Sequence, residues 1–310
     1  MRRVAFGLAV ALIAAAVASC GGPSARPTPQ PGGGGNGGGG GNGGAVNPPA
    51  NNPPVIESIA IKGSRAGQPA NFADLGEAIA VSAKVRDDET AVDQLVYTWT
   101  ATSGTFTGTG PAVTWRAPAT APLDVRGITP ASVTITLAIT EKYGQPGGPL
   151  TFEQSVSQTA AVSLHDSAKE VGEMSRQFLL DFSDTTIKDA DYIMRNFGKP
   201  ALCPEPGEVT SERTDVTRNF TEFKVVNSSV GADVTTVNFG GHCPVFNNRG
   251  DACSTVPVLW DSVKLSDGSR SFSSGNDIIA AAYSVPDKRW FLCASRYQVL
   301  KTIGAARSIR

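Results

Sequence analysis

The sequence predicts a multidomain protein in which an all-β sandwich is followed by an α+β domain. Between residues 55 and 165, short segments alternate apolar and polar residues with the period of two that is typical of strands. After residue 167 the period changes to that of amphipathic helices, and further strand patterns follow. A length of 310 residues is enough for two domains. We therefore expect a β-sandwich over residues 55–165 and an α+β domain over residues 167–310.

The strands of the first domain are separated by turn-rich segments at residues 63–67, 104–111 and 143–148. Six or seven short strands in about 110 residues, with turns at this spacing, are typical of a β-sandwich. The predicted strands are Val55–Ile61, Ala78–Val85, Leu95–Ala101, Ala112–Trp115, Ser132–Thr140 and Ser155–Leu164.

Several residues of these strands resemble the immunoglobulin-like domains of the polycystic-kidney-disease (PKD) type. The bacterial members show a Tyr-x-Trp on the third strand, here Tyr97 and Trp99, and a Trp-x-Ala-Pro segment, here Trp115 to Pro118. They also show an alternating run near the end, here residues 133–137. The sequence departs from the family after Trp99, where Trp-Asp-Phe-Gly-Asp-Gly is usual. The resemblance implies an immunoglobulin-like spacer, or a module for protein or glycan contacts, and not catalysis.

Three features of this domain have two interpretations each. Trp99 and Trp115 fit either a sugar-stacking platform or the sandwich core, and the core is the commoner place for such residues. The acidic residues at 87–93 fit either a calcium loop or a solvated loop, and the absence of an EF-hand register favours the solvated loop. Gly104, Gly108 and Gly110 predict a turn, because no Lys-Ser/Thr and no helix follow them as a phosphate loop requires.

Two helices are predicted at the start of the second domain. Val171, Met174, Phe178 and Phe182 are spaced by three, four and four residues, which is typical of the core-facing stripe of a helix. Ser167 and Glu170 fit a capping box at its start. A second helix is predicted over residues 187–197, ended by Gly198 and Pro200.

Strand patterns follow the helices, and this order favours helices on one face of an antiparallel sheet. The segment from Trp260 to Cys293 resembles the curved sheet of the nuclear-transport-factor-2-like cone. That resemblance implies a pocket, which would be the default ligand site. The predicted strands are Glu208–Val216, Phe220–Asn227, Ala232–Phe239, Val256–Leu265, Asp277–Ser284 and Arg289–Arg296, with residues 285–288 as a hairpin turn between the last two.

Four of the five cysteines lie in this second domain. An even number of cysteines in an exported chain predicts two disulfides, for which three connectivities are possible. Cys243 and Cys253 flank a short loop, so the simplest pairing joins them and leaves Cys203 with Cys293. The rival interpretation is a metal site made with His242 and Asp251. The chain has no Cys-x-x-Cys, so we predict disulfides and no metal.

The amino terminus has the pattern of a secretory signal. Met1-Arg2-Arg3 is followed by an apolar stretch from Val4 to Val17, which is too short to span a bilayer. The tetrad Val17-Ala18-Ser19-Cys20 then resembles the bacterial lipobox. The resemblance implies a signal peptide over residues 1–19 and a lipid-modified Cys20 that anchors the protein to a membrane. An ordinary signal peptide with an incidental cysteine is the alternative.

Two further predictions concern localisation. By resemblance to Gram-negative sorting, Gly21 after the cysteine favours the outer membrane, with the protein facing the periplasm or the cell surface. Residues 20–54 are rich in Gly and Pro and lack apolar periodicity, so we expect a disordered tether that holds the folded part away from the membrane.

Composition bears directly on function. Lys and Arg total 27 against 28 Asp and Glu, a balance that excludes a generally basic nucleic-acid-binding protein. The chain has two histidines and no Gly-x-Ser-x-Gly elbow, which argues against nucleophilic catalysis. A pair of carboxylates acting in hydrolysis stays open.

The sequence therefore predicts a non-enzymatic, lipid-anchored envelope protein without a cofactor. It would act as a binding, adhesion or structural module with an envelope protein or a glycan as partner. The alternative is a small-ligand-binding protein or a hydrolytic enzyme built on the cone-shaped domain. A deep pocket lined by several titratable side chains would favour that alternative.

Overall fold

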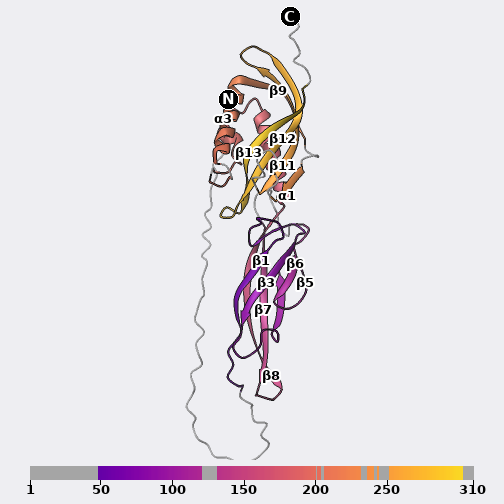
Figure 1. Ribbon diagram of the computed structural model, residues 1–310, viewed down its shortest axis with the longest axis vertical. Helices are drawn as coiled ribbons and strands as arrows, with labels where there is room; N and C mark the ends of the chain where they lie inside the picture. The colour runs from indigo at the N-terminus through magenta and orange to yellow at the C-terminus, as the bar shows by residue number, and fades with distance from the viewer. Residues whose placement is uncertain are drawn as a thin grey trace, which may run out of the picture. The chain divides into compact units, whose positions relative to one another are not determined.

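We describe the protein from a computed structural model, in which β-strands predominate (Figure 1). The structure describes residues 48–120, 131–199, 201–203, 206–231, 236–240, 243 and 251–302. These residues belong to one compact unit that begins at Pro48. The predicted signal peptide, the predicted lipid attachment at Cys20 and the tether as far as residue 47 lie outside the described residues.

Two four-stranded sheets form the first part of this unit, which we call the two-sheet lobe. Their strand orders are β1-β3-β6-β5 and β2-β8-β7-β4, and all neighbours are antiparallel except β2 and β8. All six predicted strands are present, and the short strands β2 and β5 are additional. The strands are β1 (Val55–Lys62), β2 (Phe72–Asp74), β3 (Ala78–Arg86), β4 (Val96–Ala101), β5 (Thr105–Thr107), β6 (Ala112–Arg116), β7 (Ala131–Gly144) and β8 (Leu150–His165).

The core of the two-sheet lobe lies between its sheets. Alternate residues of β3, β6 and β7 are buried there, including Ile79 and Trp115 from one sheet and Ile135 from the other. Trp115 is fully buried, and its indole N–H donates a hydrogen bond to the Ser103 carbonyl at 3.1 Å. Gly104 has a φ of +85°, and a Cβ there would lie 2.4 Å from Trp115 Nε1, so this turn requires glycine. Trp115 is thus a core residue, as expected.

The acidic loop after β3 forms a local turn. The Asp87 carboxylate accepts hydrogen bonds from the backbone N–H groups of Glu89 (3.0 Å) and Thr90 (2.6 Å). Within the described part of the chain, no group of three or more His, Cys, Asp and Glu side chains is arranged to hold a metal ion. The contacts of Asp87 therefore account for it as a turn residue.

A five-stranded antiparallel sheet and three helices form the rest of the unit, which we call the C-terminal lobe. The strand order is β10-β11-β12-β13. One edge of β11 pairs with two strands: its first residues, 252–255, pair with β10, and residues 258–264 pair with β9. Helix α1 packs against β9, β10, β11 and β13, while α3 packs against β9 and β13. Figure 1 shows the strands curving around these helices. The elements are α1 (Ser167–Ser183), α2 (Ala190–Ile193), α3 (Pro206–Glu222), β9 (Phe223–Val230), β10 (Thr236–Phe239), β11 (Ala252–Lys264), β12 (Arg270–Ser284) and β13 (Arg289–Thr302).

The strand predicted over Glu208–Val216 is wrong, because these residues lie in helix α3. Their Thr and Val residues suggest a strand, but Val209, Glu212 and Val216 are spaced by three and four residues. Those three side chains form the buried or half-buried face of the helix. The following strand begins at Phe223 rather than at Phe220, and the lobe has three described helices where two were predicted.

The two predicted helices differ in detail from the observed ones. The N-cap of α1 is Asp166, whose carboxylate accepts from the Lys169 N–H at 3.3 Å, so the capping box does not start at Ser167. The second predicted helix shrinks to the four residues of α2. Beyond α2 the backbone pairs with β13, where the Gly198 N–H donates to the Leu292 carbonyl at 2.8 Å. Gly198 is therefore not a helix C′ residue.

Two disulfides join Cys203 to Cys293 and Cys243 to Cys253, with Cα–Cα distances of 5.4 and 5.1 Å. This is the simplest of the three connectivities that the sequence allows. The four cysteines pack with Ile278, Ala280 and Ala282 in a cluster separate from the main core of the lobe. Disulfides indicate an oxidising, non-cytoplasmic compartment. Within the residues that the structure describes, no helix has the length and apolar character needed to cross a membrane.

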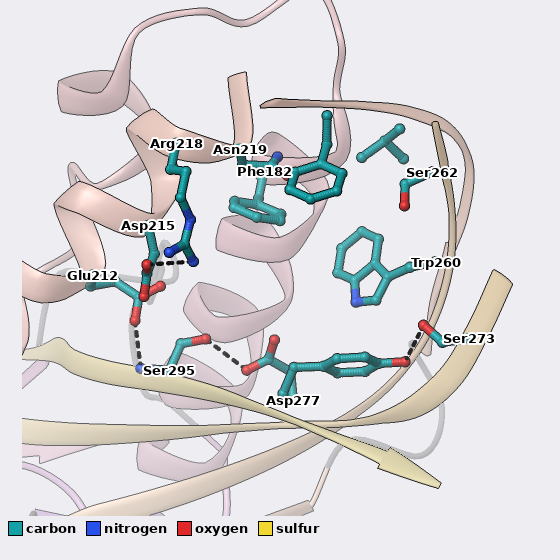
Figure 2. Close-up of a pocket in the computed structure, with 13 residues that line it drawn as sticks. Phe182, Glu212, Asp215, Arg218, Asn219, Trp260, Ser262, Ser273, Asp277 and Ser295 are labelled. Carbon is teal, nitrogen blue, oxygen red and sulfur yellow. Dashed lines mark hydrogen bonds and ion pairs between the residues drawn. The ribbon is translucent and has the colours of Figure 1, made fainter. Parts of the chain in front are cut away.

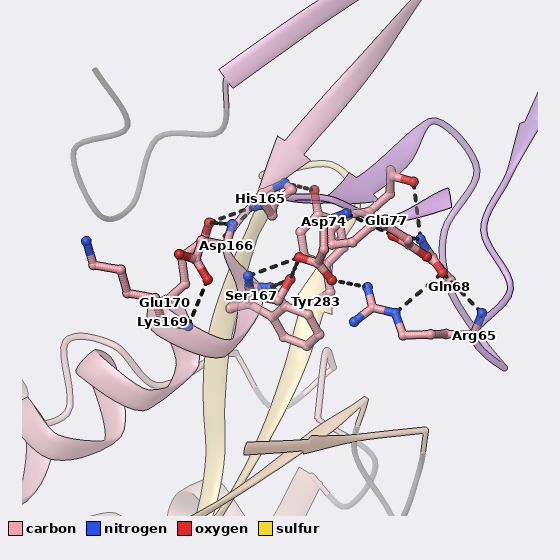
Figure 3. A network of polar contacts seen from close by, with 12 residues as sticks. Arg65, Gln68, Asp74, Glu77, His165, Asp166, Ser167, Lys169, Glu170 and Tyr283 are labelled. Carbon is pink, nitrogen blue, oxygen red and sulfur yellow. Dashed lines mark hydrogen bonds and ion pairs between the residues drawn. The ribbon is translucent and has the colours of Figure 1, made fainter. Parts of the chain in front are cut away.

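The lobes meet through a buried aromatic cluster around Phe72 of β2. Its ring stacks on His165 at 4.6 Å between centroids and meets Tyr283 edge-on at 4.8 Å. His165 is fully buried, with Nδ1 3.1 Å from the Glu170 carboxylate and Nε2 3.0 Å from the Tyr283 hydroxyl (Figure 3). Burial, together with the nearby charges of Glu170 and Asp74, raises the pKa of Tyr283 to about 12. His165 thus serves to hold the junction.

Polar contacts complete this junction. The Asp74 carboxylate accepts hydrogen bonds from the N–H and the hydroxyl of Ser167, at 3.0 and 2.5 Å, and pairs with Arg65 at 2.7 Å (Figure 3). The Trp290 indole donates to the same Ser167 hydroxyl at 3.1 Å. Every one of these groups finds a partner, which is what buried polar groups require.

Candidate ligand-binding cavity

A cavity of about 350 Å³ lies in the C-terminal lobe, between the sheet and helices α1 and α3 (Figure 2). Small-molecule sites in proteins have volumes of about 300–1,000 Å³. Four aromatic rings and three carboxyl groups line it, together with Arg218, Asn219 and several serines. The rings belong to Phe182, Phe223, Trp260 and Tyr297, and the carboxyl groups to Glu212, Asp215 and Asp277.

Strand register places the sheet's contribution on one face. Asp277 of β12 is directly opposite Tyr297 of β13, and Trp260 of β11 is directly opposite Ser273 of β12. Residues directly opposite one another in an antiparallel pair point to the same side of the sheet. The Tyr297 hydroxyl donates to Ser273 Oγ at 3.1 Å on that side (Figure 2).

Gly275 allows β12 and β13 to approach closely beside the cavity. The ladder shifts register between Ser274 and Gly275. A Cβ at Gly275 would lie 2.1 Å from the Gln298 carbonyl oxygen and 2.8 Å from Cε2 of Tyr297. Any larger residue would displace the Tyr297 ring, so this glycine positions a wall of the cavity.

Two carboxyl groups approach Ser295 from different elements. Asp277 is 5% exposed, and its carboxylate accepts from the Ser295 hydroxyl at 2.7 Å. Glu212, which α3 places opposite, accepts from the Ser295 backbone N–H at 3.0 Å. Figure 2 shows both side chains converging on this serine. Residue 295 therefore links a helix carboxyl to a strand carboxyl at the cavity.

Burial makes ionisation of both groups unfavourable. Desolvation, reinforced by the negative charge of Asp277, raises the pKa of Glu212 to about 8. Desolvation also raises the pKa of Asp277 to about 6, against the hydrogen bonds from Ser295 and from the Arg296 backbone N–H. At neutral pH the cavity thus holds a mostly protonated Glu212 beside a mostly ionised Asp277. Two such carboxyls can donate and accept hydrogen bonds, or hold and move a proton.

The aromatic wall comes from three elements. Phe182 of α1 and Trp260 of β11 are 5.7 Å apart between centroids at an interplanar angle of 69°. Trp260 and Tyr297 of β13 are 6.5 Å apart at 76°. All three rings are half-buried, so part of each is accessible from the cavity. Rings inclined in this way offer both faces and edges to a ligand.

An exposed ion pair lies beside the carboxyl pair. Arg218 and Asp215 are both exposed and are three residues apart on α3, with Nη2 and Oδ1 2.8 Å apart. Because each partner offsets the other's charge, this pair adds no net charge to the cavity.

The sequence-predicted residues lie elsewhere. The four disulfide cysteines belong to a separate cluster, and His165 lies at the junction between the lobes. His242 and Cys20 lie outside the described residues. Phe182, which the sequence assigns to the helix core, packs against that core and also lines the cavity. The resemblance to the cone predicts a pocket in this domain, but no sequence pattern points to Glu212 or Asp277.

The comparisons with known proteins give no relative: no family model matches the chain, and no curated protein and no solved structure matches it.

Proposed function

We propose that this is a lipid-anchored envelope protein whose C-terminal lobe binds a small ligand in the cavity between its sheet, α1 and α3. The observation that carries the proposal is the half-buried aromatic wall of Phe182, Trp260 and Tyr297 beside two carboxyls that share contacts with Ser295. An accessible apolar surface with a few convergent polar groups is what small-molecule sites share. This function joins the lipid-anchored envelope protein predicted from the sequence to small-ligand binding, which was the alternative to a protein or glycan partner.

The other parts of the chain have supporting roles in this proposal. The two-sheet lobe acts as an immunoglobulin-like spacer of the PKD type, supported by its strands and by Trp115 in its core. Lipid on Cys20 attaches the chain to the outer membrane, supported by the tetrad that precedes Gly21. The Gly- and Pro-rich residues before Pro48 act as the tether in this proposal, since a Gly-rich chain of about 30 residues spans roughly 30 Å.

Filling the cavity tests the binding role. Ser273→Phe places a ring on the cavity side of β12, whereas Ser274→Phe places the same ring on the opposite side. We expect compounds that raise the melting temperature of the wild-type protein to act equally on Ser274→Phe and to have no effect on folded Ser273→Phe. If they stabilise Ser273→Phe as well, the ligand site lies elsewhere.

The anchor is tested separately by Cys20→Ala. Without the cysteine there is no thioether for lipid, so the protein should move from the membrane fraction to the soluble fraction. Retention of the variant in the membrane fraction would contradict the anchoring role and leave the cavity role intact.

The carboxyl pair favours a hydrolytic enzyme as a second candidate. With pKa values of about 8 and about 6, Glu212 can act as an acid and Asp277 as a base near neutral pH. Chromogenic esters and glycosides test this candidate. An enzyme would show a bell-shaped pH–rate profile and would lose turnover in both Glu212→Gln and Asp277→Asn. Compounds that bind in the cavity but are not turned over would favour the binding protein.

A further inference from the structure

We propose that the cavity selects organic cations, molecules with a substituted ammonium group that lies against the aromatic wall and faces the Glu212–Asp277 pair. This inference rests on the proposed binding function and adds the chemical class of the ligand.

The aromatic wall supplies the first argument. The faces of Phe, Tyr and Trp rings carry partial negative charge, and they attract a cation that lies over them. Phe182, Trp260 and Tyr297 are successive neighbours with interplanar angles of 69° and 76°. Their planes therefore differ enough to surround a compact group from more than one side. A substituted ammonium group, which is both apolar at its surface and positively charged, matches such a wall.

The charge of the cavity supplies the second argument. Glu212 and Asp277 both receive hydrogen bonds from Ser295, the first from its N–H and the second from its hydroxyl. The charged neighbours that act on Glu212 are the carboxylates of Asp277, Asp215 and Glu208, and each of them disfavours its ionisation. A bound cation would place a positive charge beside Glu212 and Asp277 and so favour their ionised forms.

The same features disfavour the other ligand classes. An anion would approach Asp277, which is mostly ionised at neutral pH, and would have to compete with Asp215 for Arg218. A neutral sugar could stack on Trp260, but it has no charge that would interact favourably with the two carboxyls beside Ser295. A cation uses both the rings and the carboxyls.

Cation binding should be coupled to proton release. The charged and titratable groups around Glu212 are Glu208, Asp215 and Arg218 on its own helix, Asp277 on β12, and Arg296 and Tyr297 on β13. A cation beside the pair favours the ionised carboxylates, so protons leave as it binds. Affinity should therefore rise between about pH 6 and pH 9, through the range in which the free carboxyls titrate.

The experiment compares choline with its uncharged carbon analogue, in which a tert-butyl group replaces the trimethylammonium group. Isothermal titration calorimetry is run on the wild-type protein in phosphate and in HEPES, whose ionisation enthalpies differ. We expect choline to bind about tenfold or more tightly than the analogue, with a buffer-dependent heat that reports proton release. Glu212→Gln should lose most of the pH dependence, whereas Glu222→Gln, an exposed carboxylate on the same helix, should keep it.

Each other outcome overturns the inference. Equal affinity for the analogue would show that charge is not recognised, and binding of glucose without proton release would show a sugar site. Failure of choline and tetramethylammonium to bind at millimolar concentrations would exclude organic cations. In all three cases the proposed function is judged independently, by whether Ser273→Phe abolishes stabilisation by any compound.

Discussion

The two lobes bury similar strands in different ways. In the two-sheet lobe each sheet covers the other, and the interior around the fully buried Trp115 is mainly apolar. In the C-terminal lobe the inner face of one curved sheet is covered by helices, and Trp260 on that face stays half-buried beside a cavity. The comparison teaches that the covering layer, rather than the strands themselves, decides whether a sheet face becomes a core or a site.

Strand β12 shows this division within a single element. On its inner face Ile279 and Ala281 belong to the apolar core beneath α1, while Ser273 and Asp277 line the cavity. Burial removes water from the Asp277 carboxylate, and this desolvation disfavours its ionised form and raises its pKa. A group held at such a cost is typical of functional sites.

The largest expected effect is the loss of unfolding free energy when a tryptophan of either lobe is replaced by alanine. Trp115→Ala removes a fully buried ring and should cost about 3–5 kcal/mol of unfolding free energy. Trp260→Ala widens an existing cavity and should cost clearly less, because its ring is already half-exposed. Urea denaturation followed by circular dichroism measures both. Equal losses would contradict the distinction between a closed core and an open site.

The second expected effect comes from removing a disulfide, which should destabilise the C-terminal lobe and leave the two-sheet lobe unchanged. Both disulfides lie in the C-terminal lobe, and the one between Cys203 and Cys293 spans 90 residues. Replacing this pair with alanine should destabilise that lobe by about 2–5 kcal/mol. Hydrogen exchange read peptide by peptide measures the effect. We expect faster exchange in β12 and β13 with unchanged protection in β3 and β6, and uniform loss of protection would show that the lobes unfold together.

The third expected effect is a pH dependence of stability that comes from Glu212. Its pKa is about 8 in the folded protein and 4.5 in its unperturbed state, so the unfolded chain binds fewer protons between these values. Glu212 therefore lowers stability progressively as pH rises from about 4.5 to about 8. Glu212→Gln should be more stable than the wild type at pH 8 and similar to it at low pH. Glu222→Gln is the control, and a parallel shift in both variants would contradict the burial of Glu212.

The sequence predicted most strands because alternating apolar residues leave a clear pattern. Strands β2 and β5 were missed because three residues are too few to show a period. Helix α3 was mistaken for a strand because its Val and Thr residues have high β-propensity. The spacing of Val209, Glu212 and Val216 was the signal that could have revealed the helix.

The site itself was harder to predict. Glu212 and Asp277 become neighbours only when α3 packs against β13, and nothing in the sequence connects them. The available hint was that Asp277, an acidic residue, directly precedes an apolar run in the sequence. The disulfides, by contrast, were predictable, because four cysteines allow few pairings.

The most direct test of the account is a carbon-13 NMR titration of the Glu212 and Asp277 side-chain carboxyls in the free protein. We predict that Glu212 titrates at about 8 and Asp277 at about 6, as two interacting groups inside the C-terminal lobe. Assignments come from Glu212→Gln and Asp277→Asn. Titration of both groups near 4.5 and 3.8, their unperturbed values, would show that water reaches them freely and would contradict the cavity as a built site.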